Sequence, residues 1–233
     1  MYYFDNAATT AQKTGCRIES RLCGLDRRRH WQSVPRGPWL CLKAYDIVLT
    51  AKERIQALFH SRDRYEVAFT HNSTVALNMV LKGLIRPGDG VLTTAWEHNA
   101  VLRPLYQLEE QGVEVSVIPA VSPTGALAYE SLEKLLTPKT KWLVCNHASN
   151  VTGNVLDLDR IKAFCRNHHL GLIVDVSQTA GACDIDLSDG IVTAACFTGH
   201  KSLYGPGGTG GIVIRRDVEA RPFYYRWGRR PYL

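Results

Sequence analysis

The chain has 233 residues, of which 45% are hydrophobic, and carries a formal net charge of +6. This length and apolar content are sufficient for one large domain with a sizeable core. We find no signal peptide and no apolar run of about 20 residues, so the sequence favours a cytoplasmic protein over an exported or membrane-spanning one.

The positive charge belongs to two segments. Residues 11–43 hold eight Lys or Arg against two acids, and residues 215–233 hold six Arg against two acids. The segments contribute +6 and +4, which leaves −4 for the rest of the chain. This balance is typical of an ordinary cytosolic enzyme and gives no reason to expect a nucleic-acid partner for the main part.

Seven cysteines are present, and none forms a Cys-x-x-Cys pair. We interpret them as reduced thiols, and we predict no metal site. They are Cys16, Cys23, Cys41, Cys145, Cys165, Cys183 and Cys196.

From residue 44 onward, apolar runs and helical periods alternate. The pattern predicts strands over Glu66 to Thr70, Val91 to Thr94, Glu114 to Ile118, Lys141 to Cys145, Leu170 to Val174, Thr193 to Phe197 and Ile212 to Ile214. It predicts five helices. The first starts at Ala44 and carries the apolar residues Tyr45, Ile47, Val48, Ile55, Leu58 and Phe59, and the third carries Val101, Leu105 and Leu108. The second runs from Ser73 to about Gly83, the fourth from Ser131 to Leu136, and the fifth from Leu158 to His168. Strands alternating with helices predict an α/β fold with a mainly parallel sheet and a site along its carboxyl edge.

Ser73 and Thr74 open the second predicted helix. Such residues ordinarily cap a helix. The same helix start also directs free N–H groups and the positive end of the helix dipole outward, which suits a phosphate. Taken alone, these residues favour the capping role, and a phosphate site becomes the better interpretation only in combination with Lys201.

Two features near the end of the sheet pattern indicate chemistry. Lys201 lies among small residues after an apolar run, where desolvation lowers the pKa of a lysine and frees its amine to attack a carbonyl. Asp175 ends a predicted buried strand, which is where open α/β sheets bind ligands. A solvated loop lysine is the plain alternative for Lys201 taken alone.

The stretches Val174-Asp175-Val176-Ser177-Gln178 and Thr198-Gly199-His200-Lys201 together resemble the class V aminotransferase group of pyridoxal-phosphate enzymes, within it the cysteine desulfurases and selenocysteine lyases. The resemblance implies the fold type I large domain of these enzymes, with a seven-stranded type of sheet flanked by helices. It also implies that Lys201 carries pyridoxal 5'-phosphate as a Schiff base, and that Asp175 pairs with the pyridine nitrogen.

The same resemblance assigns further residues. His98 would stack on the cofactor ring and move protons, and Asn150 and Gln178 would contact its phenolic oxygen. Ser73 and Thr74 would hold the phosphate beside Lys201, and Thr198 and His200 belong to the lysine motif. The site residues implied are Ser73, Thr74, His98, Asn150, Asp175, Gln178, Thr198, His200 and Lys201.

The resemblance covers residues 1–10, as a lead-in to the site, and residues 44–223, as the cofactor-binding domain. Residues 11–43 and 224–233 depart from the family, and a small C-terminal domain is missing. We interpret both departures as frame-shifted or misassigned coding sequence; for 11–43 the alternative is a basic arm that binds nucleic acid or an acidic partner.

The implied reaction converts L-cysteine to L-alanine and transfers the sulfur to an enzyme thiol, in a homodimer that can pass sulfur to an acceptor protein. We expect this activity to be impaired, because no cysteine matches the family's nucleophile. The alternatives are another class V reaction (transamination, selenocysteine lysis or β-elimination) and a non-enzymatic truncated remnant.

Overall fold

The computed structural model describes the backbone of residues 38–222 and the side chains from residue 45 onward. Its central feature is a seven-stranded sheet with strand order β1-β9-β8-β7-β6-β2-β3. The strands are β1 (Tyr65–Thr70), β2 (Gly90–Thr94), β3 (Glu114–Ile118), β6 (Thr140–Asn146), β7 (Gly171–Asp175), β8 (Val192–Thr198) and β9 (Gly210–Arg215). Strands β8, β7, β6, β2 and β3 are parallel neighbours, whereas β9 is antiparallel to both β8 and β1. The predicted, mainly parallel α/β sheet is confirmed.

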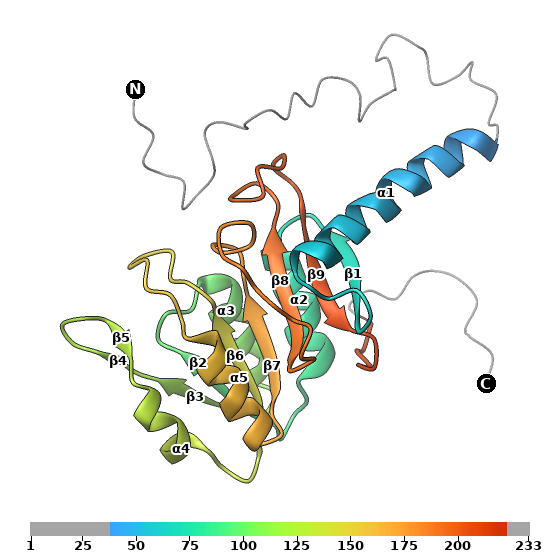
Figure 1. The fold of residues 1–233 in the computed structure, drawn as a ribbon. Coiled ribbons are helices and arrows are strands. Elements are labelled where there is room, and N and C mark those ends of the chain that lie inside the picture. The colour runs from blue at the N-terminus through green and yellow to red at the C-terminus, as the bar shows by residue number, and fades with distance from the viewer. Residues whose placement is uncertain (1–37, 223–233) are drawn as a thin grey trace, which may run out of the picture.

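Helices cover both faces of this sheet (Figure 1). Helices α2 (Ser73–Leu84) and α3 (Asn99–Glu109) pack on one face, where Val144 and Ile173 point. Helix α5 (Leu158–Asn167) and the end of α1 (Pro38–Leu58) pack on the other, where Leu143 and Leu172 point. Successive residues of a strand face opposite sides, so a strand that is covered twice must be apolar throughout. The continuous apolar runs in the sequence therefore become the central strands.

All seven predicted strands are present, with ends that differ by one or two residues. Two short strands were not predicted: β4 (Ala120–Val121) and β5 (Ala126–Leu127), which pair as an antiparallel hairpin. The predicted helix from Ser131 is divided between the short 3₁₀ turn η1 (Tyr129–Ser131) and α4 (Leu132–Leu135).

Helix α1 begins at Pro38, earlier than predicted and inside the segment 11–43. The amphipathic pattern predicted from Tyr45 does not bury its first apolar side chains, because this part of the helix projects away from the sheet (Figure 1). Tyr45, Ile47 and Val48 are between 44% and 59% exposed, whereas Phe59, just after the helix end, is buried at 1%. Among the α1 side chains described, from residue 45 onward, Ile55 in the last turn packs against the core. Residues 1–10, most of 11–43 and 224–233 lie outside the described part.

Within residues 38–222, none of the helices has both the length and the apolar character needed to cross a bilayer.

Candidate active site

The carboxyl ends of four neighbouring strands meet at one edge of the sheet. Asn146 ends β6 and is paired in register with Asp175, which ends β7. Beyond the end of β2 comes His98, and beyond the end of β8 comes Lys201. Because parallel strands present their carboxyl ends at the same edge, side chains that are far apart in the sequence converge there.

Asp175 is buried, with 6% of its surface exposed. Its Oδ1 accepts hydrogen bonds from the backbone N–H of Ser177 at 3.0 Å and from the Ser177 hydroxyl at 2.5 Å. Burial raises the pKa of Asp175, while the two Ser177 bonds and the charges of Lys201 and His98 act in the opposite direction. The two Ser177 bonds therefore fix the orientation of the carboxyl group, and the basic side chains of Lys201 and His98 interact with it electrostatically.

Lys201 is half-buried in the turn between β8 and β9. Burial lowers the pKa of its ammonium group, and the nearby charge of Asp175 partly offsets this. The turn is closed by a hydrogen bond of 2.7 Å from the Gly205 N–H to the Gly199 carbonyl. A Cβ at Gly199 would lie 2.2 Å from the Thr209 hydroxyl oxygen, so the close turn that presents Lys201 requires glycine there.

A small cavity joins these groups. Six of the predicted site residues line it: Ser73, His98, Asn150, Asp175, Gln178 and Lys201. Asn146, Ala148 and Ser177 line it too, although the sequence analysis gave them no role. Thr74, Thr198 and His200 are not among the lining residues.

Of these three, Thr198 and His200 support the turn. The Thr198 hydroxyl lies 3.0 Å from His200 Nδ1, directly beside Lys201 in the chain. Thr74 is exposed in the first turn of α2.

The interpretation of Ser73 and Thr74 as helix caps is wrong. The N-cap of α2 is Asn72, whose side-chain oxygen accepts a hydrogen bond of 2.9 Å from the Val75 N–H. The polar side chain one residue earlier thus satisfies this donor. Ser73 and Thr74 occupy the first helical positions, where backbone N–H groups have no partner within the helix, and Ser73 lines the cavity.

We expect Asn72→Ala to lower the free energy of unfolding by about 1 kcal/mol, as loss of an N-cap does. Urea unfolding of the 233-residue chain measures this. The matched control is Ser73→Ala, which removes a hydroxyl that caps nothing and should leave stability almost unchanged. Equal losses in the two variants would contradict the assignment of the cap.

His98 is the N-cap of α3 and is exposed at the cavity. Its Nδ1 accepts a hydrogen bond of 3.0 Å from the Ala100 N–H. An accepting Nδ1 carries no proton, so the neutral ring holds its proton on Nε2. The helix start therefore sets the tautomer of this histidine.

Glu97, next to His98, is a buried acid that the sequence analysis missed. Its side chain is 9% exposed and lies between the ends of β2 and β6. Burial raises its pKa to about 8, and the charge of Asp175 acts in the same direction. The available signal was an acid three residues beyond the end of a buried strand, a weaker form of the signal that drew attention to Asp175.

The four described cysteines are free thiols, and none lines the cavity. Burial raises the pKa of Cys145, Cys165 and Cys196, which keeps these three thiols protonated and weakly nucleophilic. Cys183 is exposed. Across residues 38–222, no cluster of His, Cys, Asp and Glu side chains is suited to a metal ion.

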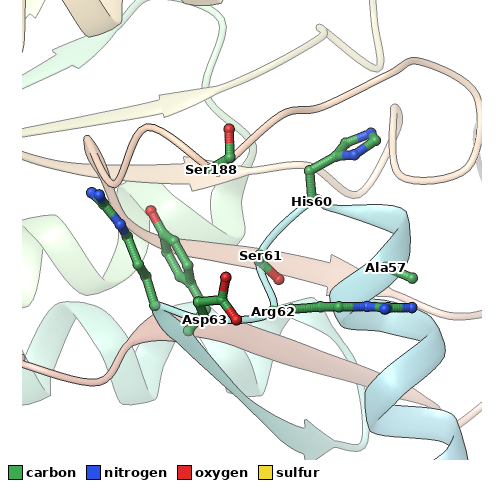
Figure 2. Close-up of a pocket in the computed structure, with 8 residues that line it drawn as sticks. Ala57, His60, Ser61, Arg62, Asp63 and Ser188 are labelled. Atoms are coloured by element: carbon green, nitrogen blue, oxygen red, sulfur yellow. The ribbon is translucent and has the colours of Figure 1, made fainter.

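A larger pocket lies at the opposite edge of the sheet (Figure 2), between the end of α1 and the loop that carries Ser188. Two of its polar side chains contact the segment around Ser188 and the start of β8. His60 contacts Asp184 at 3.0 Å, and the Tyr65 hydroxyl donates to the Val192 carbonyl at 2.6 Å. It contains no half-buried amine facing a buried acid, so we place the candidate site at the carboxyl edge.

Three comparisons with known proteins each found similar proteins. The Aminotransferase class-V family profile matches residues 2–226. The cysteine desulfurase IscS of Acinetobacter baumannii (strain AYE) is 33% identical over 223 residues, which is 94% of this chain and 55% of that protein. The chain therefore spans about half the length of this curated relative.

Two solved structures are similar over most of this chain. One is SspA in complex with cysteine, with a TM-score of 0.82 and 25% identity over 96% of this chain and 65% of that chain. The other is a C-DES mutant with glycine covalently linked to its PLP cofactor, with a TM-score of 0.75 and 28% identity over 84% of this chain and 53% of that chain.

Proposed function

Since the chain belongs to the aminotransferase class-V family, we propose that it binds pyridoxal phosphate at the carboxyl edge of the sheet and acts on L-cysteine as a cysteine desulfurase. The observation that carries the proposal is the pairing of Lys201, an amine whose pKa is lowered by burial, with the buried acid Asp175 across one cavity. The reaction would release L-alanine and transfer the sulfur to a thiol.

The residues present fit this cofactor. Lys201 supplies an amine that binds an aldehyde, and Asp175, oriented by Ser177, supplies an acceptor for a protonated ring nitrogen. The first turn of α2 contains no acidic residue, and its free N–H groups at Ser73 and Thr74 suit a phosphate. Bound pyridoxal phosphate would contribute an electron-accepting ring.

The remaining lining residues would orient the ring and move protons. Asn150 and Gln178 offer amide groups to a phenolic oxygen. His98 presents an Nε2 that holds a proton when the ring is neutral, because Nδ1 is occupied by the Ala100 N–H. Lys201, once its amine is free, is a second group able to hold a proton beside the substrate.

The choice of L-cysteine rests on similarity. The curated relative is a cysteine desulfurase, and the SspA structure contains cysteine. The thiol that accepts the sulfur is not among the described lining residues. We therefore propose that the described half binds cofactor and amino acid, and that turnover by this chain alone is low.

We further propose that the intact protein is a cytoplasmic homodimer that passes sulfur to an acceptor protein. The proposal also divides the chain into four parts. They are a lead-in of residues 1–10, an anomalous segment 11–43, a cofactor domain of residues 44–223 and an anomalous tail of residues 224–233.

Product analysis separates the candidate reactions. With pyridoxal phosphate and L-cysteine, the 233-residue chain should form L-alanine, and Lys201→Ala should form none. Pyruvate and ammonia instead would indicate β-elimination, and the 2-oxo acid that retains sulfur would indicate transamination. Alanine formed from L-selenocysteine alone would indicate a selenocysteine lyase. A change in the cofactor's spectrum on adding L-cysteine would support amino-acid binding even at low turnover, and no change with any amino acid would contradict the proposal.

A further inference from the structure

Glu97 is held beneath the cavity by neutral partners. Its Oε1 accepts hydrogen bonds from the Thr94 hydroxyl at 2.5 Å and from the Asn146 N–H at 2.9 Å. Its other oxygen, Oε2, is buried and has no hydrogen-bond partner, and the same is true of Asn146 Oδ1. A buried oxygen without a donor is costly, so two orphaned acceptors on adjoining side chains indicate a missing hydrogen.

The charges around Glu97 disfavour its ionised form. Asp175 on β7 and the Cys145 thiol on β6 interact with it electrostatically, and a negative charge on either would repel a carboxylate. Two neighbouring buried carboxyl groups do not both ionise easily. The pair is therefore expected to share one negative charge and one proton.

The hydrogen bonds and the cations decide where the proton resides. Asp175 receives two hydrogen bonds from Ser177 and the favourable charges of Lys201 and His98. Glu97 likewise accepts two hydrogen bonds at one oxygen, but the charge that acts on it is that of Asp175, which opposes its ionisation. The negative charge thus belongs on Asp175 and the proton on Glu97. A proton makes Oε2 a donor, and Asn146, whose backbone N–H already contacts Glu97, carries a buried acceptor without a donor.

We propose that Glu97 is a positioning residue that remains a neutral carboxylic acid at the base of the site and so leaves Asp175 as the one ionised carboxyl group facing the cofactor's ring nitrogen. The assignment of the proton follows from the described residues alone. The consequence for the cofactor rests on the proposed function.

Infrared spectroscopy of the 233-residue chain without cofactor tests the proton directly. The pKa of Glu97 is raised from the ordinary 4.5 of a glutamate to about 8. At a pH midway between these two values, we expect one carboxylic-acid carbonyl band that shifts in heavy water. The band should disappear in Glu97→Gln and persist in Asp175→Asn and in Glu114→Gln, which alters an exposed acid. A band that disappears in Asp175→Asn and persists in Glu97→Gln would overturn the proposal.

Isotope labelling gives the same answer without a substitution, in case a variant fails to fold. Carboxyl-labelled glutamate should shift the band, and carboxyl-labelled aspartate should not; the reverse result, or no band at all, would overturn the proposal.

The pH dependence of unfolding provides a readout that a purely structural role would not change. The folded state retains a proton that the unfolded state loses above pH 4.5, so the wild type becomes less stable as pH rises towards about 8. The ratio of the wild-type to the Glu97→Gln unfolding constant should rise about tenfold per pH unit in this window. A ratio that does not change with pH would contradict the proposal.

With pyridoxal phosphate present, the wild-type visible spectrum should change near pH 8, and the Glu97→Gln spectrum should not. A spectrum of bound cofactor that changes equally in both would contradict the cofactor part of the proposal. A chain that shows the infrared band but binds no cofactor would refute the proposed function and leave the proton assignment supported.

Discussion

Replacing Lys201 with alanine is expected to abolish the visible absorbance band that pyridoxal phosphate acquires when it is bound through a lysine. The amine of Lys201 is half-buried, its pKa is lowered by burial, and it lines the same cavity as Asp175. No other lysine lines that cavity. Because the band depends on a covalent bond to one amine, the loss should be complete. Spectra of the purified variants with added cofactor measure it.

The matched control for this experiment is Lys134→Ala, which removes an exposed lysine at α4. It should retain the band at full intensity. Exogenous methylamine should partly restore a band in Lys201→Ala by replacing the missing amine. A wild-type band that survives in Lys201→Ala would show that another lysine holds the cofactor.

The second large effect is expected from Asp175→Asn, which removes the negative charge and keeps the shape. Truncating one partner of a buried charge pair costs about 2–5 kcal/mol, which corresponds to roughly a 30- to 4,000-fold loss of affinity. Cofactor titrations followed by absorbance would show this as a weaker dissociation constant. The backbone fold should be retained, because the amide can still accept the Ser177 hydrogen bonds.

Two further variants calibrate the Asp175 result. Ser177→Ala removes the hydroxyl bond to Asp175 and leaves the backbone bond, so its loss of affinity should be smaller. Asp63→Asn alters an exposed acid at the opposite edge of the sheet and should have no effect. If Asp63→Asn weakened the cofactor as much as Asp175→Asn, the carboxyl edge would not be the binding site.

The sheet could be predicted because its central strands are covered on both faces. Residues 172–174 form a continuous apolar run, and the structure buries them in the middle of β7. Once strands and helices alternate, parallel topology brings Asp175 and Lys201 to one edge. The convergence of these two residues therefore follows from local patterns and chain order, whereas His98, Asn150 and Gln178 were predicted from the resemblance to a known family.

Other features depended on information that is not local. The β4–β5 hairpin has only two residues in each strand, too few for an alternating pattern. The antiparallel direction of β9 depends on how the glycine-rich turn folds back, with the Gly199 N–H bonded to the Thr209 carbonyl. The amphipathic pattern around Tyr45 indicated a helix correctly, but it did not show that this part of α1 projects from the sheet.

The role of Glu97 was the hardest to predict. Its proton is governed by burial and by Asp175, which lies on a strand far along the chain. Its orphaned oxygen appears only once β2 and β6 are placed side by side. Similarly, Ser73 resembled a helix cap until Asn72 was found to accept the bond from Val75.

Borohydride reduction of the chain with bound pyridoxal phosphate, followed by peptide mapping, tests the central claim most directly. Reduction makes the bond between cofactor and lysine permanent, so mass spectrometry can locate it. We predict a single modified peptide, with the cofactor on Lys201, and no modification of that peptide when the cofactor is omitted. Modification spread over exposed lysines, with Lys201 unmodified, would contradict the proposed site.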